Sequence, residues 1–241
     1  MRLADVNQPT QESLIMYQVF QRQTMNFKTL LSIAAIAAVT QVTGCAMVQT
    51  TANLETPVVA NPTTGPVVKI VSVTDNRKFV YPHEAGDCET PSVNSEQALK
   101  NTDLKARAYA RQGRCDGGEW ANHAMVVVPE GETVAGGVKD AVIAGVKGAG
   151  YRIVENDPEA VPVRISIEKF WLANGLDGWG AQCTYMYQVN ITSPNATYEV
   201  TRSVKDKIYL GLTATHGKYA KAALVNLTND VSDNLKSKPL D

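Results

Sequence analysis

The sequence has few of the features that mark catalytic, metal-binding or nucleic-acid-binding proteins. Its three histidines, His83, His123 and His216, lie in different regions without a metal-site spacing. No Gly-x-Ser-x-Gly nucleophile motif and no phosphate-binding glycine loop are present. The 23 basic and 24 acidic residues leave a net charge of −1, which gives no positive field for a phosphate backbone. We therefore expect no enzyme, no catalytic residue, no metal, no cofactor and no nucleic-acid partner.

Long apolar runs are also missing, because the only one covers 10 residues, 30–39, too few to span a bilayer. It follows a short positive start at Met25 to Lys28 and precedes Val42-Thr43-Gly44-Cys45. This order is typical of a secretory signal peptide, and its end resembles the bacterial lipobox. In a lipobox the Cys thiol receives a diacylglycerol, the chain is cut before that Cys, and the new amino terminus is acylated. The alternative is an ordinary signal peptide with a chance cysteine.

The lipobox divides the chain into four parts. Residues 1–24 are a mixed polar stretch that does not fit the pattern, so we expect translation to start at Met25. Residues 25–44 are then the signal peptide. Cys45 carries the lipid, palmitate included, and 45–66, with Pro57, Pro62 and Pro66, is expected to be a flexible tether. Residues 67–241 have the size of one domain.

The residue after the acylated cysteine bears on location. Ala46 stands where Asp would signal inner-membrane retention in enteric bacteria. We therefore expect an outer-membrane lipoprotein that faces the periplasm, with a membrane attachment that depends on its lipid.

Hydrophobic periodicity predicts an α+β fold with a mostly antiparallel sheet and two helices packed on one of its faces. The helices are expected over 134–149 and about 216–236, with a possible short helix over 96–111. Expected strands are 67–74, 125–128, 151–155, 161–167, and a hairpin of 182–191 with 197–210. Because Gly136, Gly137 and Gly145 are costly inside a helix, they predict that the first helix lies very close to the sheet. Residues 79–122 are expected to form a long irregular insertion.

Several of these features occur together in one family of bacterial proteins. The lipobox, the Val-Thr-Asp-Asn-Arg segment at 73–77 and the Gly-Tyr-Arg-Ile-Val segment at 150–154 resemble the YajG-like family of outer-membrane lipoproteins. The resemblance covers most of 67–238 and implies location and fold, without any catalytic residue. The insertion 79–122 is longer than the resemblance implies.

Three cysteines remain once Cys45 carries the lipid. Cys88 and Cys115 both lie in the insertion, and we favour a disulfide between them over a bridge that uses Cys183. Cys183 lies on the apolar face of its strand, where a small buried residue is expected. A metal site built from His83, Glu84, Asp87 and Cys88 is a weaker alternative for the same loop.

One region combines aromatic and polar residues. Phe170, Trp171, Asn174, Asp177 and Trp179 surround an expected hairpin tip at 175–180. Buried tryptophans that close the core are the first interpretation of this cluster. A binding edge made of Trp171, Trp179, Asp177 and Asn174 is the second, and it requires an exposed ring.

These observations leave three hypotheses about function. The first is a non-catalytic, lipid-anchored module that binds an envelope protein or peptidoglycan. The second is an auxiliary or activator lipoprotein of an envelope transport or cell-wall synthesis machine. The third is a periplasmic enzyme that uses Cys183.

Overall fold

The computed structural model describes residues 49–81, 84, 89–93, 95–112, 124–177, 180–208 and 215–240. All of them belong to one structural unit, Met47–Asp241. Within these ranges, no helix is long and apolar enough to cross a membrane. The fold is α+β, as the sequence predicts.

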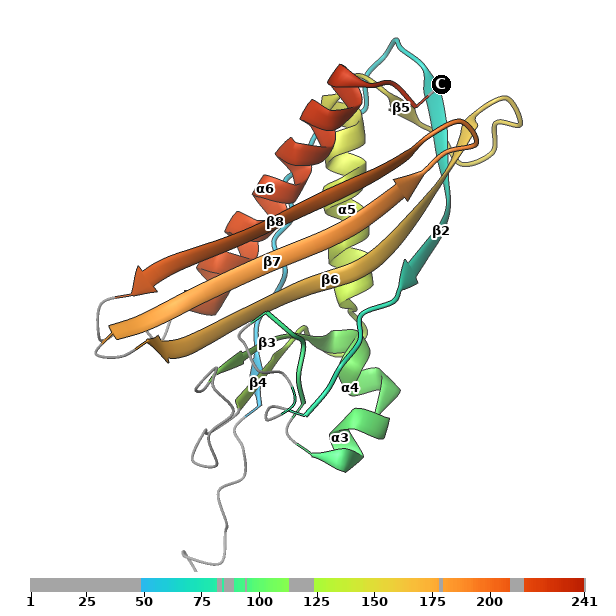
Figure 1. Cartoon of the computed structure of the whole chain (residues 1–241). Coiled ribbons are helices and arrows are strands. Elements are labelled where there is room, and N and C mark those ends of the chain that lie inside the picture. Colours follow the sequence, from blue (N-terminus) through green and yellow to red (C-terminus); the bar gives the residue numbers. More distant parts are fainter. Residues whose placement is uncertain are drawn as a thin grey trace, which may run out of the picture. The chain divides into compact units, whose positions relative to one another are not determined.

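A mixed β-sheet forms the centre of the domain (Figure 1). Its strands are β1 (Thr50–Thr51), β2 (Val67–Asp75), β3 (Ala108–Gln112), β4 (Ala124–Val127), β5 (Arg152–Ile153), β6 (Val161–Asp177), β7 (Gly180–Thr192) and β8 (Thr197–Ile208). The order across the sheet is β1-β4-β3-β6-β2-β5, and β7 followed by β8 extends it from β6. The long strand β6 therefore connects every part of the sheet.

The prediction of a mostly antiparallel sheet is wrong. The β6–β7, β7–β8 and β3–β4 pairs are antiparallel, but β2 runs parallel to β5 and β6, β3 to β6, and β1 to β4. The chain passes through helix α5 (Val134–Gly148) between β2 and the strands β5 and β6. A helical crossover returns the chain in its original direction, so the strands that it joins are parallel.

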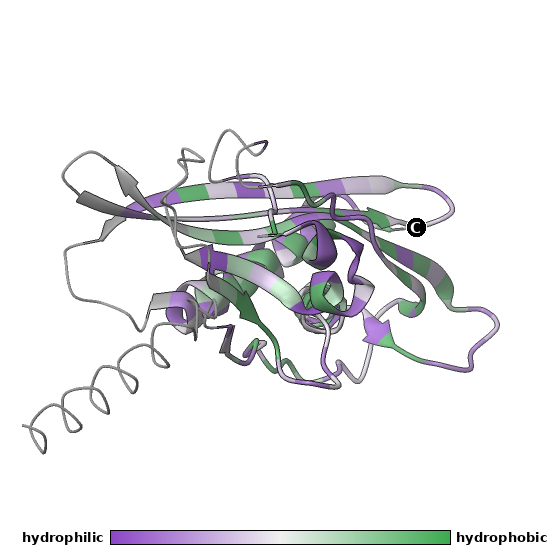
Figure 2. Ribbon diagram, turned by 90° about the horizontal axis from the view of Figure 1, so that it is seen from below, coloured by the Kyte–Doolittle hydropathy of each residue, from purple (hydrophilic) through white to green (hydrophobic). Residues whose placement is uncertain are grey.

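The two long helices, α5 and α6 (Thr215–Ser237), pack on one face of the sheet (Figure 2). The side chain of Thr133 caps α5 by accepting a hydrogen bond from the amide of Gly136. Apolar residues at helical spacing face the sheet and form the larger core: Val134, Val138, Val142 and Val146 from α5, and Leu224, Leu227, Val231 and Leu235 from α6.

A second apolar cluster lies on the opposite face of β6. Side chains alternate along a strand, so Phe170 and Leu172 join the larger core while Trp171 and Ala173 face the second cluster. Two short helices, α3 (Glu96–Lys100) and α4 (Thr102–Arg107), contribute to this cluster. Around residues 170–173 of β6, both faces of the sheet are thus covered by apolar side chains.

The expected helix over 96–111 is wrong, and the insertion 79–122 is only partly irregular. Asn101 ends α3 and at the same time begins α4, where its side chain accepts a hydrogen bond from the amide of Leu104. Residues 108–112, expected at the end of the helix, form β3 inside the sheet. An Asn in the middle of the segment interrupts the helix because its side chain competes for backbone amides.

The expected flexible tether is a docked segment over most of its length. Residues 50–66, called here the N-terminal strap, begin with β1, which pairs with β4. Leu54 packs against Gly137 of α5, where a Cβ would lie 2.9 Å from the Leu54 side chain. The Asn61 amide exchanges two hydrogen bonds with the backbone of Ile153. Proline-rich composition suggested a free chain, but side-chain and backbone contacts hold the strap against the domain.

Candidate functional site

Trp171, a candidate for either the core or a binding edge, is part of the core. Trp171 is 0% exposed, and its ring meets that of Phe79 edge to face at 5.8 Å. A fully covered ring is not reachable by a partner, so Trp171 closes the second apolar cluster, as the first interpretation of the sequence held. Asn174 and Asp177 lie in β6, but their side chains fall outside the described residues, as does all of Trp179.

Cys183 also lies in the core, where its surroundings oppose its use as a nucleophile. The residue is fully buried and makes no disulfide within the described part of the chain. Burial and the nearby negative charge of Asp206 raise the pKa of the Cys183 thiol to about 12. The thiolate is the reactive form, and this environment keeps the thiol protonated at neutral pH.

The other cysteines, Cys45, Cys88 and Cys115, lie outside the described residues, as do His83 and Asp87. The disulfide and the alternative metal site in that loop therefore stay predictions. Elsewhere in the described ranges, no group of three His, Cys, Asp or Glu residues is placed to hold a metal ion.

The most constrained polar group in the described structure is Arg77, which lies where β6 changes its parallel neighbour. β2 pairs with β6 as far as Ile167, and β3 pairs with it from Leu172 onward. Arg77 occupies the interval between these ladders. Its Nη1 donates to the carbonyl oxygens of Ala108 at 2.6 Å and of Phe170 at 3.4 Å. The guanidinium thus satisfies buried carbonyl groups at the junction of β2, β3 and β6.

Arg77 also joins this junction to α4. Its side chain forms a two-pronged ion pair with Asp75, with Nε–Oδ1 and Nη2–Oδ2 distances of 2.8 Å each. Nη2 donates as well to the carbonyl oxygen of Lys105 at 2.8 Å, near the negative end of the α4 dipole. The guanidinium carbon lies 5.2 Å from the centre of the Phe79 ring. With so many partners, Arg77 holds the fold and is not free to bind a ligand.

The sequence predicts a strand that ends at residue 74, and it does not identify this role of Asp75 and Arg77. The signal available was an acidic and a basic residue two positions apart at the end of a buried strand. Such a pair can form in a turn without any burial. Only the tertiary structure shows that the side chain of Arg77 is 0% exposed.

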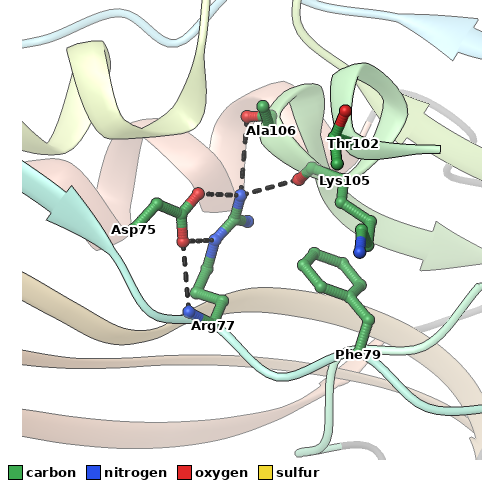
Figure 3. A pocket seen from close by; sticks show the side chains of 6 residues that line it. All are labelled: Asp75, Arg77, Phe79, Thr102, Lys105 and Ala106. Atoms are coloured by element: carbon green, nitrogen blue, oxygen red, sulfur yellow. Dashed lines mark hydrogen bonds and ion pairs between the residues drawn. The ribbon is translucent and has the colours of Figure 1, made fainter. Parts of the chain in front are cut away.

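A cavity of about 260 Å³ opens beside this ion pair (Figure 3). Its lining consists of Asp75, Arg77, Phe79, Thr102, Lys105 and Ala106. Within the described part of the chain, the ammonium group of Lys105 makes no ion pair or hydrogen bond, whereas Asp75 and Arg77 neutralise each other. The cavity therefore offers one available positive charge beside an aromatic ring and the hydroxyl of Thr102. Those groups suit an acidic group attached to an apolar one.

A second cavity, of about 270 Å³, lies beside the residues that alternate with Asp75, Arg77 and Phe79 along the chain. Asn76 and Lys78 line it together with Lys169 and Gln188. The Asn76 amide donates to the carboxylate of Glu168 at 3.2 Å, which fixes its orientation. Residues 75–79 thus present alternate side chains to two cavities, so this segment is the candidate binding region of the domain.

Comparisons with known proteins assign no family to the chain. No family model matches it, and no curated protein does. Three solved structures show low similarity. A crystal structure of an uncharacterised protein has a TM-score of 0.45 at 7% identity and covers 78% of this chain and 98% of its own. A Xanthomonas campestris protein of the DUF330 family has a TM-score of 0.41 at 10% identity, with coverage of 78% and 94%. A minor lipoprotein from Acinetobacter baumannii has a TM-score of 0.28 at 10% identity, with coverage of 42% and 79%.

Proposed function

We propose that this chain is a bacterial envelope lipoprotein, anchored by lipid at Cys45, whose domain is a non-catalytic module that binds an envelope protein or peptidoglycan. The observation that carries the proposal is the ten-residue apolar segment 30–39 followed by Val42-Thr43-Gly44-Cys45. Outer-membrane location, periplasmic orientation and membership of the YajG-like family belong to the same proposal.

The docked strap limits how far the domain extends from the membrane. Thr50 already pairs with β4. Four residues lie between Cys45 and Thr50, and the five steps of the chain from one to the other span about 17 Å at full extension. A tether that was free as far as residue 66 would span about 70 Å. The short connection supports a domain held close to the bilayer and disfavours an activator that reaches a distant synthase.

The cavity beside Phe79 supports binding of an acidic partner group. Its walls are held in place by the Arg77–Asp75 ion pair and by α4, so little ordering is needed when a partner binds. Lys105 supplies the available charge, and the Phe79 ring supplies an apolar surface. Acidic side chains of envelope proteins and the carboxylates of peptidoglycan peptides both have this chemistry.

The anchor is tested by fractionation of cells that express Cys45→Ser. We expect the wild-type chain in the membrane fraction and the variant in the soluble fraction or held as the uncut precursor. Cys183→Ser is the matched control, because it removes a buried thiol and leaves the anchor. Membrane fractionation and normal cleavage of Cys45→Ser would contradict the lipoprotein proposal.

The binding region is tested with the full anchored chain in intact cells. Lys105→Glu should lower the yield of crosslinked partner or peptidoglycan about fivefold, the loss expected for one charged contact worth about 1 kcal/mol. Lys100→Glu is the control, because Lys100 lies on the neighbouring helix α3 and is 75% exposed. Equal yields from the two variants would exclude the cavity beside Phe79 as the binding region.

A further inference from the structure

We propose that two copies of this chain associate through their β8 strands, which pair antiparallel and join the two sheets into one. This inference goes beyond the proposed function and does not depend on the lipid anchor. Figure 1 shows β8 as the outer strand of the β6–β7–β8 meander. It pairs with β7 from Thr197 to Ile208, and no described strand borders its other edge.

The β8 edge is regular enough to accept another strand. Its 12 residues, TYEVTRSVKDKI, contain no proline and no glycine, and its register with β7 has no bulge. Proteins commonly protect an edge strand with a proline, a bulge, a very short length or charged side chains. Of these, β8 has only the charged side chains, so a second strand must match their charges to pair with it. The backbone groups along its outer edge are therefore geometrically ready for a ladder of hydrogen bonds.

Side chains alternate along β8, so one face of the strand contacts the core of its own domain and the other face does not. Tyr198 and Val200 are buried in the larger core on the side of α6, and Val204 packs against the same core. The other face carries the exposed residues Glu199 and Lys205. Arg202 and Asp206 lie on the face towards α6. Among the described side chains of β8, the charges on the face away from α6 are therefore Glu199 near the start of the strand and Lys205 near its end, which also pairs with Glu89 at 3.1 Å.

These charges complement a second copy of β8. In an antiparallel pair centred on Arg202, Glu199 lies opposite Lys205 of the second copy, and the two-fold axis repeats the pair. Val200 then lies opposite Val204 of the second copy on the other face. Cross-strand pairs of opposite charge and of β-branched residues both stabilise antiparallel strands.

The centre of this pairing brings the two Arg202 residues face to face. Each guanidinium is neutralised within its own chain, because Asp230 of α6 accepts hydrogen bonds from it at 2.6 and 2.9 Å. A register centred on Thr201 sets Glu199 opposite Ser203 of the second copy and loses both ion pairs. A register centred on Ser203 sets Glu199 opposite Lys207, but it also sets Val200 opposite Asp206 and loses the apolar pair. The charge pattern of β8 therefore favours self-association in the register centred on Arg202.

Sedimentation equilibrium of the full chain in density-matched detergent tests the proposal. We expect a monomer–dimer equilibrium for the wild type. Glu199→Lys and Lys205→Glu should each raise the dissociation constant at least tenfold, because each replaces two attractive pairs by two repulsive ones. The double variant carrying both changes restores opposite charges across the interface and should return to within about threefold of the wild type.

Two controls separate this effect from changes within one chain. Lys205 also pairs with Glu89 at 3.1 Å, so Glu89→Gln should leave the dissociation constant unchanged if the interface depends on β8 alone. Glu159→Lys reverses an exposed charge outside β8 and should also leave it unchanged. A wild-type chain that stays monomeric at 100 µM would overturn the proposal. So would a double variant that dissociates as readily as the single variants.

Discussion

Replacing Arg77 with alanine tests the account of how the domain is held together. The variant removes the donor to the carbonyl oxygens of Ala108 and Phe170, both of which belong to residues that are 0% exposed. It also removes the partner of Asp75, whose side chain is 24% exposed and can regain water.

The magnitude follows from these contacts. A buried carbonyl left without a donor costs about 1 to 3 kcal/mol, and removing one partner of a buried charge pair costs about 3 to 5 kcal/mol. Because water can reach Asp75, we expect the lower part of this range, about 3 to 4 kcal/mol. Arg77→Lys keeps the charge but loses the fork of donors, so about half of that loss is expected.

Urea unfolding of the full chain measures these losses, provided that the slope with urea concentration is unchanged. Arg202→Ala is the matched control. Arg202 makes a similar two-pronged ion pair with Asp230, but its side chain is 41% exposed. Its loss should cost only about 0.5 to 1 kcal/mol. If Arg77→Ala lowers the free energy of unfolding no more than Arg202→Ala does, the structural role given to Arg77 is wrong.

Three further predictions concern the core. Trp171→Ala should cost about 3 to 5 kcal/mol of stability in urea unfolding. Trp171→Phe should cost less, because the buried indole N–H has no acceptor among the described residues. A loss below about 1 kcal/mol for the alanine variant would contradict burial. Gly145→Ala places a Cβ 2.6 Å from the carbonyl oxygen of Thr228 in α6, so it should lower stability by about 1 to 3 kcal/mol. Gly136→Ala is the control, because a Cβ at residue 136 has room and should not lower stability. Equal melting temperatures for these two variants would refute the close contact at Gly145. Cys183 should react slowly with iodoacetamide at pH 8 until the chain is unfolded. Rapid labelling of the native chain would show an accessible thiolate and contradict this prediction. Because folding raises the pKa of the Cys183 thiol from 9.0 to about 12, the contribution of this thiol to stability is complete below pH 9 and should be lost as the pH rises towards 12.

Periodicity was sufficient to predict the elements whose pattern is local. The helix over 134–149, the strand that starts at Val67 and the hairpin of β7 and β8 all lie where the sequence places them. In each, regular spacing of apolar residues coincides with turn or cap residues at the ends. The two-helix layer on one face follows from the same patterns.

The features that the sequence did not predict depend on contacts between distant segments. The glycines of α5 indicated close packing, but the neighbour of Gly145 is the backbone of α6 and that of Gly137 is Leu54 of the strap, not the sheet. A glycine shows that something lies close without showing what. Likewise, β3 and β6 are parallel because of the path of the whole chain, which no short pattern records.

The candidate site was predicted least well. A tryptophan beside glycines and an aspartate is compatible with a core residue, the first interpretation, and with a binding edge, the second. The burial of Trp171 decides in favour of the core. The cavity beside Phe79 combines residues from the end of β2 and from α4, about 25 positions apart in the chain. Residues brought together by the fold in this way share no spacing motif.

Intact mass spectrometry of the protein extracted from membranes tests the central claim most directly. The account predicts a chain that begins at Cys45 and carries a diacylglyceryl group and an amide-linked acyl chain. A chain with an unmodified Cys45 thiol, or one cut at another position, would contradict the lipid anchor on which the proposed function depends.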